Sequence, residues 1–596
     1  MAFVPENPLV IQSDKSVLLE VQNDRYAEAR DALARFAELE KSPEYLHTYR
    51  ITPLSLWNAA ATGLSAEEIL ASLERYSKYD IPPNVRVDIF DIVSRYGRLK
   101  LERHAEGLAL RSDDRALLVE ITRHKTLAPL IQRELGADSL LVGAGDRGRL
   151  KQALLNFGYP AEDLAGYLEG SRLEFRLRER SLSGQPFGLR PYQQAAVDVF
   201  HSGGGLRGGS GVIVLPCGAG KTIVGMGAMA ALQSATLILT PSTVAARQWI
   251  DELLDKTTLT EDQIGEYTGM EKQIRPVTIA TYQILTYRKR RSADFPHFAL
   301  FDSENWGLII YDEVHLLPAP VFRITAELQA RRRLGLTATL VREDRREADV
   351  FTLIGPKKHD VPWKELERQG WIAEAECYEV RINLNPDDRM AYALTPEEEK
   401  YRFAAENREK YRILDQLLAK HPHDNILIIG MYIQQLEQVA ARYDLPLITG
   451  KTPIREREKL LDRFRSGEIT RMVISKVGNF SIDLPEANVA IQISGTFGSR
   501  QEEAQRLGRI LRPKGNGLLA HFYSIVTRDT RDQDFAANRQ LFLTEQGYRY
   551  NILYEHELSE FKPVTYGAQL VEAAPRRIPA GDSPGNGRAG AADDSR

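Results

Sequence analysis

Short runs of aliphatic and β-branched residues alternate along this chain with stretches whose apolar residues recur at helical spacing, most regularly after residue 210. This alternation is typical of parallel strands joined by crossover helices. It occurs in two successive series, so the pattern predicts two similar α/β lobes. The first series comprises residues 212–215, 236–240, 277–280, 308–311 and 334–337, and the second comprises 425–430, 445–449, 472–475, 489–493 and 518–526.

The chain before these lobes has a different pattern. Residues 1–100 are predicted to form a mainly helical domain, because Ile69, Leu70 and Leu73 recur at helical spacing after the cap residues Ser65 and Glu68. Residues 101–180 are predicted to form a small α+β domain. It combines strand-like apolar runs at 116–121, 139–142 and 173–177 with a helical stretch at 147–157.

The domain boundaries follow from changes in composition. Residues 181–188 are polar and rich in Gly and Pro, which predicts a linker, and the first lobe is expected over 189–380. A connecting segment at 381–410 leads to the second lobe at 411–572. Residues 573–596 consist mainly of Ala, Gly, Pro, Arg, Asp and Ser, and they bury too little apolar surface to offset the entropy of ordering. We therefore expect a disordered tail there.

Composition restricts the class of protein. With 596 residues the chain is too long for one hydrophobic core. It contains neither a membrane-length apolar run nor a basic, apolar start, so a cytoplasmic location is expected. Its only cysteines, Cys217 and Cys377, exclude a disulfide framework and a four-thiolate metal cluster. The formal net charge of -4 gives no global attraction to phosphates, so any nucleic-acid binding must use local patches.

A phosphate-binding loop is predicted where the first strand of the first lobe ends. The glycines of such a loop let backbone N–H groups approach phosphate oxygens, Lys221 neutralises phosphate charge and Thr222 offers a hydroxyl to Mg²⁺. Leu215 replaces the first glycine of the general pattern, but the strand before the loop and the helix after it support the assignment. The loop residues, all predicted to bind ATP, are Pro216, Cys217, Gly218, Ala219, Gly220, Lys221 and Thr222.

Two adjacent carboxylates follow another strand of the same lobe. Asp312 and Glu313 come directly after the apolar run 308–311, and the carboxyl ends of parallel strands share the edge where the phosphate loop lies. Asp312 is expected to hold Mg²⁺ together with Thr222, and Glu313 to polarise the attacking water. His315, two residues later, is expected to link this site to neighbouring polar groups rather than to bind a metal.

These motifs occur in the order found in superfamily-two helicases, which the chain resembles over roughly 188–526. The resemblance implies two tandem RecA-like lobes, and it implies that Arg190 and Gln193 contact the adenine of ATP. Thr337, Ala338 and Thr339 are similar to the motif that couples hydrolysis to movement. The residues similar to the strand-contacting motifs, and so predicted to bind DNA, are Thr240, Pro241, Thr281, Tyr282 and Gln283.

A closer resemblance follows from Arg342, Glu343 and Asp344, which come directly after the coupling motif. Together with the Asp-Glu-Val-His sequence at 312–315, this triplet resembles the XPB family of DNA helicases, in which an Arg-Glu-Asp element is implicated in unwinding. The alternative is a solvated run of charges. Membership would imply a DNA-dependent ATPase that moves 3′ to 5′, uses ATP and Mg²⁺, and acts in nucleotide-excision repair or transcription.

In the second lobe, Asp483 and the pair Arg509 and Arg512 resemble the last two helicase motifs. The two arginines are three residues apart on a predicted helix and therefore share a face. We expect both to reach the γ-phosphate bound by the first lobe, where an arginine finger stabilises transition-state charge.

The sequence signals for DNA contact are less specific than those for the ATP site. Basic runs at 288–291, which include Arg288, and at 331–333 are candidate phosphate contacts, with Tyr282 and Tyr287 available for stacking. The segment 381–410 corresponds to the family's DNA-gripping thumb but is short and carries few basic residues, which puts processive unwinding in doubt.

Three functions remain compatible with these motifs: a DNA helicase, a double-stranded DNA translocase without strand separation, and an ATP-gated scaffold for repair partners. The expected partners are DNA and a nuclease or another repair protein, and the protein is expected to be a monomer.

Overall fold

A computed structural model describes residues 3–41, 45–205, 208–216, 218–288, 295–318, 320–321, 325, 331–338, 347–361, 366, 369, 375–475, 487–495, 519–545 and 550–563. Several predicted features lie outside these residues and are not tested by the structure. They are Cys217, Thr339, Arg342, Glu343, Asp344, Asp483, Arg509, Arg512 and the tail at 573–596.

The described part of the first hundred residues contains four helices, where a mainly helical domain was predicted, and also a four-stranded antiparallel sheet in the order β1-β2-β4-β3, which the sequence pattern did not predict. Its strands are only three to five residues long, and in β3 only Leu39 is buried, so no long apolar alternation marks them. The elements are β1 (Leu9–Ile11), β2 (Ser16–Glu20), α1 (Tyr26–Leu33), β3 (Glu38–Lys41), β4 (Leu46–Arg50), α2 (Pro53–Ala61), α3 (Ala66–Tyr76) and α4 (Pro83–Arg95).

A small α+β domain follows, built on a five-stranded sheet in the order β7-β8-β6-β5-β9. The predicted strand at 139–142 and the predicted helix at 147–157 are confirmed. The run at 116–121 is instead part of a helix, capped by Asp114, whose carboxylate accepts a hydrogen bond from Leu117 N. The elements are β5 (Leu99–His104), β6 (Gly107–Arg111), α5 (Arg115–Arg123), β7 (Ile131–Gly136), β8 (Ser139–Val142), α6 (Arg147–Phe157) and β9 (Ala161–Asp163).

The segment between this domain and the first lobe packs on the lobe. The run at 173–177 forms no regular strand, and Leu173 and Phe175 join the core of the first lobe. Isolated bridges pair Arg172 with Ser234 and Leu177 with Thr257.

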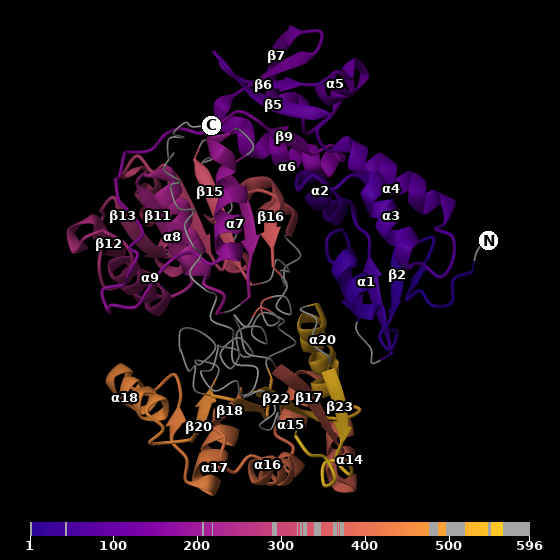
Figure 1. Ribbon diagram of the computed structural model, residues 1–596, viewed down its shortest axis with the longest axis vertical. Helices are drawn as coiled ribbons and strands as arrows, with labels where there is room; N and C mark the ends of the chain where they lie inside the picture. The colour runs from indigo at the N-terminus through magenta and orange to yellow at the C-terminus, as the bar shows by residue number, and fades with distance from the viewer. Residues whose placement is uncertain are drawn as a thin grey trace, which may run out of the picture.

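The first lobe is a seven-stranded parallel sheet in the order β12-β13-β11-β14-β15-β10-β16. All five predicted strands are present, and every residue of the interior strand β11 is buried because helices cover both faces of the sheet (Figure 1). The main elements are α7 (Pro191–His201), β10 (Ser210–Val214), α8 (Lys221–Leu232), β11 (Thr236–Thr240), α9 (Thr243–Lys256), β12 (Ile264–Tyr267), β13 (Val277–Thr281), α10 (Tyr282–Leu285), β14 (Leu308–Asp312), β15 (Arg332–Thr337), η7 (Val350–Ile354) and β16 (Lys357–Asp360).

The second lobe repeats this architecture, with the strand order β19-β20-β18-β21-β22-β17-β23 and all pairings parallel. The boundary expected at residue 380 falls inside β17, whose whole length pairs with β22 of this lobe. The main elements are β17 (Ala375–Ile382), α14 (Pro386–Leu394), α15 (Glu397–Ala405), α16 (Glu409–Lys420), β18 (Ile426–Gly430), α17 (Ile433–Tyr443), β19 (Leu447–Ile448), α18 (Ile454–Arg465), β20 (Arg471–Ser475), β21 (Val489–Gln492), β22 (Ala520–Thr527), α20 (Arg531–Glu545) and β23 (Tyr550–Tyr554).

Figure 1 shows the lobes one above the other, with the N-terminal domain (indigo) lying beside both. Phe351 of the first lobe and Leu541 of the second both pack against the core of this N-terminal domain. Within the described part of the chain, no helix is long and apolar enough to cross a membrane.

Candidate ATP site and nucleic-acid interface

Three neighbouring strands of the first lobe bring the predicted nucleotide residues together. β15 lies between β10 and β14, and the three run parallel. Val214 pairs with Thr337, and Leu336 pairs with Asp312, so all three strands end at the same level. The phosphate loop, Thr337 and the two carboxylates therefore meet at one edge of the sheet.

The phosphate loop has the backbone that its glycines predict. Gly218 and Gly220 have φ angles of 82° and 81°, which favour glycine, and α8 begins immediately afterwards at Lys221. A Cβ on Gly220 would lie 2.5 Å from Gln193 Nε2, so a side chain there would also displace Gln193. The amino end of α8, preceded by these glycines, is a suitable cradle for phosphate.

Gln193 supports this loop. Its Nε2 donates to Ala219 O at 2.9 Å, and Tyr192 donates its hydroxyl to the same carbonyl at 2.8 Å. Gln193 Oε1 accepts from Arg190 N at 2.9 Å, which caps α7. In this conformation the Gln193 amide is used by the protein, while its predicted contact with adenine, and that of Arg190, stay predictions.

Lys221 and Glu313 form the central ion pair of the site, with Nζ and Oε1 2.7 Å apart and both side chains nearly buried. Burial alone would raise the pKa of Glu313, but the neighbouring Lys221 ammonium, with a smaller effect of His315, outweighs it and holds this pKa below its usual value. Glu313 is thus an ionised carboxylate, the state that a general base requires.

Asp312 is held on three sides. Trp249 Nε1 donates to its Oδ2 at 3.0 Å, Glu313 N donates to its Oδ1 at 3.0 Å, and Tyr282 donates its hydroxyl to Asp312 O at 2.9 Å. Burial, together with the neighbouring charge of Glu313, raises the pKa of Asp312 to about 6. A divalent cation would stabilise the ionised form of such a carboxylate.

His315 lies between Glu313 and the end of β15. Its Nδ1 lies 2.6 Å from Thr337 Oγ1 and 3.5 Å from Glu313 Oε2. Ala338 follows and is also buried. His315 is therefore the one residue that separates Thr337 from Glu313 in this chain of contacts.

The residues present fit ATP and Mg²⁺. Thr222 lies in the first turn of α8, and Asp312 stands at the end of β14, so both oxygen ligands lie at the edge that carries the phosphate loop. Glu313 Oε1 contacts the Lys221 ammonium, and Glu313 Oε2 is buried 3.5 Å from His315 Nδ1.

The predicted strand contacts divide into buried and exposed side chains. Thr240, Thr281 and Tyr282 are buried, with exposed fractions of 0%, 2% and 4%, and Pro241 is half-buried. Tyr282 cannot stack on a base in this structure, which corrects that part of the prediction. Gln283, Tyr287 and Arg288 are exposed, and the Arg288 guanidinium lies 4.5 Å from the centre of the Phe295 ring.

The basic run at 331–333 is not a free phosphate-binding patch. Arg333 is fully buried, and its Nε donates to Leu353 O at 2.7 Å; Arg331 donates to Asn305 Oδ1 and to Trp306 O. These residues lie at the start of β15, so they occupy the sheet edge opposite the nucleotide residues.

The structure adds Trp249, Tyr192 and the hydroxyl of Tyr282 to the site. Sequence reasoning did not assign these contacts, because each joins residues that are far apart in the chain. The available signal was an aromatic residue with one polar atom on the buried face of a helix next to a functional motif.

Comparisons with known proteins agree with this arrangement. Residues 366–570 match the model described as ERCC3/RAD25/XPB C-terminal helicase, residues 186–342 match the type III restriction enzyme res subunit, and residues 9–136 match a helicase conserved C-terminal domain. A protein named DNA 3'-5' helicase XPB from Kineococcus radiotolerans is 57% identical over 92% of this chain and 96% of its own length.

The chain belongs to the XPB family of superfamily-two helicases. A more distant member is 34% identical over 92% of each chain; it is named the general transcription and DNA repair factor IIH helicase/translocase subunit XPB and comes from Enterocytozoon bieneusi. Among solved structures, the Hef helicase domain of Pyrococcus furiosus matches 58% of this chain and 97% of its own, with 15% identity and a TM-score of 0.41.

Proposed function

We propose that this protein is an ATP-dependent DNA helicase that moves 3′ to 5′ and separates DNA strands in repair or transcription. The observation that carries the proposal is the buried contact of Lys221 with Glu313 at the end of the phosphate loop, with Asp312 and Thr337 on adjoining strands. Relatives named DNA 3'-5' helicase XPB and a transcription and repair factor subunit support the substrate and the process.

The residues have distinct roles in this proposal. Backbone N–H groups at Gly218 to Thr222 and the Lys221 ammonium bind the phosphates, and Thr222 and Asp312 would hold Mg²⁺. The cation, when bound, would neutralise charge that develops on the phosphates. Glu313 orients the attacking water and accepts its proton, and Arg509 and Arg512 stabilise the transition state from the second lobe.

The coupling residues and the DNA surface complete the proposal. His315 and Thr337 would carry the state of Glu313 to the end of β15, and Ala338, Thr339 and the triplet at 342–344 follow directly in sequence. Among the predicted strand contacts, Gln283 and Arg288 are exposed, so we propose that these two side chains contact DNA. A nuclease or another repair protein is the partner that we propose.

The ATPase rate measured with single-stranded DNA, duplex DNA and RNA tests this function. We expect DNA to stimulate turnover more than RNA does. Lys221→Ala removes a charge that binds the phosphates and Glu313→Gln removes the general base, so each should lower DNA-stimulated turnover by at least about 100-fold. Glu304→Gln, which changes a partly buried carboxylate before β14, should remain near wild type. Normal turnover in the Glu313 variant would refute the assigned chemistry.

Two other functions use the same fold. A double-stranded translocase would hydrolyse ATP equally well on blunt duplex and displace no strand. An ATP-gated scaffold would bind nucleotide with negligible turnover after DNA is added. The ionised state of Glu313 beside Lys221 favours hydrolysis over the scaffold.

A further inference from the structure

The segment that leaves the α+β domain after β9 contacts the first lobe at the sheet edge opposite the nucleotide residues. Tyr167 lies in this segment and donates its hydroxyl to Ser210 Oγ at 2.7 Å. Ser210 is the first residue of β10, and it pairs with Arg333 near the start of β15. The Arg333 guanidinium carbon lies 5.7 Å from the centre of the Tyr167 ring. Tyr167 thus contacts the starts of both strands whose other ends carry the phosphate loop and Thr337.

Arginines from both domains surround the ring of Tyr167. The guanidinium carbon of Arg147, from α6 of the α+β domain, lies 5.3 Å from the ring centre. That of Arg332, from β15, lies 6.0 Å from it. A cation over an aromatic ring is attracted by the negative charge of the ring face. One side chain therefore joins a helix of the small domain to two strands of the lobe.

A buried cluster of charges orients Arg147 and the residues before Tyr167. Arg147 donates from Nε and Nη2 to the two carboxylate oxygens of Asp163, at 3.0 and 2.7 Å, and from Nη1 to Gly166 O at 2.9 Å. Lys151 Nζ lies 3.1 Å from Asp163 Oδ2, and the three charged side chains are at most 10% exposed. Burial alone would raise the pKa of Asp163, but Lys151 and Arg147 outweigh it and hold this pKa below its usual value. The bidentate pair fixes the geometry of the chain that leads to Tyr167.

The residues after Tyr167 are bound to the first lobe through their backbone. Ser171 N donates to Asn305 O at 2.8 Å, and Leu173 packs in the core of the lobe. Gly170 passes so close to Gly307 that a Cβ on Gly170 would lie 2.1 Å from Gly307 N. Any side chain at position 170 would push the segment away from the lobe, because the atoms that it would meet belong to the backbone and cannot rotate away.

We propose that Tyr167 holds the α+β domain on the first lobe, so that the two move as one rigid body when the lobes open and close. Domains joined by a linker alone are expected to move relative to each other. Here a rotation of the α+β domain would separate buried polar groups from their partners, which is costly, so the contacts specify one arrangement. The motion of the lobes comes from the proposed function, whereas the rigid junction rests on these contacts alone.

The distance between the two domains, measured by double electron–electron resonance in the full chain, tests the proposal. Spin labels replace Glu106 of the α+β domain and Met270 of the first lobe, whose side chains are exposed. They are introduced as non-natural amino acids, because the chain has two cysteines of its own. We expect one narrow distance distribution, unchanged when a non-hydrolysable ATP analogue, Mg²⁺ and DNA are added. A shift or a broadening on addition of these ligands would overturn the proposal.

Two variants disrupt the junction in different ways. Tyr167→Ala removes the ring and the hydroxyl, and Gly170→Ala places a methyl group against the backbone of Gly307. We expect each to widen the distance distribution at least about twofold, while hydrogen exchange in β6 and β8 shows that the α+β domain remains folded. Gly145→Ala, in the same domain, is the control, because a Cβ there meets no atom within 4 Å. The wild-type width in both junction variants would overturn the proposal.

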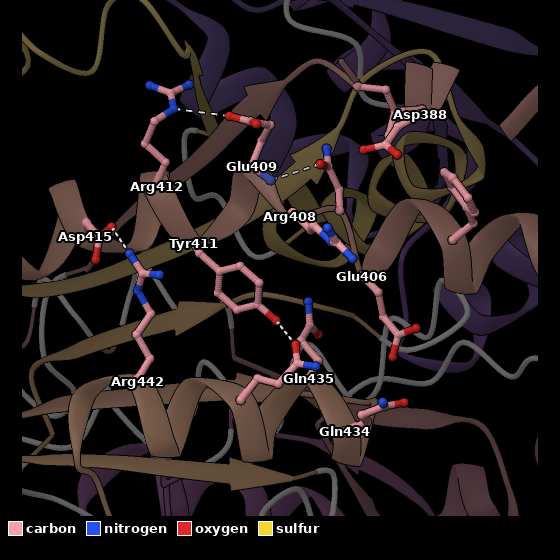
Figure 2. A pocket seen from close by; sticks show the side chains of 14 residues that line it. Asp388, Glu406, Arg408, Glu409, Tyr411, Arg412, Asp415, Gln434, Gln435 and Arg442 are labelled. Atoms are coloured by element: carbon pink, nitrogen blue, oxygen red, sulfur yellow. Dashed lines mark hydrogen bonds and ion pairs between the residues drawn. The ribbon is translucent and has the colours of Figure 1, made fainter. Parts of the chain in front are cut away.

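Tyr167→Phe removes only the hydroxyl that binds β10, and we expect a width between those of the wild-type chain and Tyr167→Ala. Its matched control is Tyr411→Phe, since Tyr411 of α16 in the second lobe donates its hydroxyl to Gln438 Oε1 at 2.6 Å. Figure 2 shows Tyr411 beside the ion pair of Arg442 with Asp415, in a cavity of about 1000 Å³. This control should keep the wild-type width, and equal widths in the two Phe variants would overturn the proposal.

A second pair of labels separates the rigid junction from the proposed function. These labels replace Met270 and Met390, the latter an exposed residue of α14 in the second lobe. The proposed function predicts that their distance changes when the ATP analogue and DNA bind, because the lobes then come together. A constant distance would contradict that motion of the lobes, and the widths measured in the Tyr167 variants would still decide whether the junction is rigid.

Discussion

At the scale of single residues, the sequence predicted the charged groups of the ATP site but not their supports. Lys221, Asp312 and Glu313 could be assigned because each follows a strand whose carboxyl end must lie at one edge of a parallel sheet. The contacts of Trp249 and Gln193 could not, because they depend on how α9 and α7 pack against that edge. The adenine contacts of Arg190 and Gln193 remain predictions.

Trp249→Phe tests the support of Asp312. The variant keeps most of the buried volume but removes the indole N–H that orients Asp312 Oδ2. Loss of a group that orients a metal ligand costs roughly 10- to 100-fold in metal affinity, so we expect the Mg²⁺ concentration for half-maximal ATPase to rise about tenfold. Trp306→Phe is the control, since Trp306 is equally buried and donates to Leu300 O, away from the site. An unchanged Mg²⁺ dependence would exclude this role for Trp249.

Thr337→Val tests the coupling through His315. The substitution preserves shape and removes the hydroxyl 2.6 Å from His315 Nδ1. We expect ATPase to stay within a few-fold of wild type and strand displacement to fall by about tenfold, one tenfold step being about 1.4 kcal/mol. Thr278→Val, at a buried threonine of β13 in the same sheet, is the control. Parallel losses of ATPase and strand displacement would argue against a coupling role.

At the scale of elements, strands buried on both faces were predictable, and the short strands of the N-terminal sheet were not. The five predicted strands of the first lobe are continuous apolar runs such as β11. The run at 116–121 forms a helix because short apolar runs fit either structure, and the cap at Asp114 decides it. The N-terminal sheet was missed because its strands are only three to five residues long, too short to show a clear alternation.

One strand of that sheet is expected to make the stability of the N-terminal domain depend on pH. His47 of β4 is buried against Tyr26 of α1, and burial, with a smaller effect of Arg30, lowers its pKa to about 4. Near pH 6.5 the His47 side chain binds a proton in the unfolded chain but not in the folded domain. The free energy of unfolding is therefore greatest above that pH. As the pH falls toward 4, it decreases by about 3 kcal/mol.

The measurement is urea unfolding at pH 7 and pH 4.5. His47→Gln should reduce the difference in unfolding free energy between the two pH values, whereas His423→Gln, at an exposed position, should not. If both variants keep the wild-type pH dependence, His47 is not its source.

At the scale of the whole molecule, the two lobes and the N-terminal domain form a connected motor. The N-terminal domain contacts both lobes through Phe351 and Leu541, and α20 packs near β3. The nucleotide residues that the structure describes all belong to the first lobe, while the arginines expected to complete the site belong to the second. ATP binding is therefore expected to bring the lobes together, and hydrolysis to release them.

Strand displacement on matched DNA duplexes tests this account most directly. Duplexes with a 3′ tail, a 5′ tail or blunt ends are incubated with ATP and Mg²⁺, with the wild-type chain and with Glu313→Gln. We predict that the wild-type chain displaces the strand of the 3′-tailed duplex in preference to the others, and that Glu313→Gln displaces none. Displacement only from the 5′-tailed duplex, or ATP hydrolysis on every duplex without strand displacement, would contradict it.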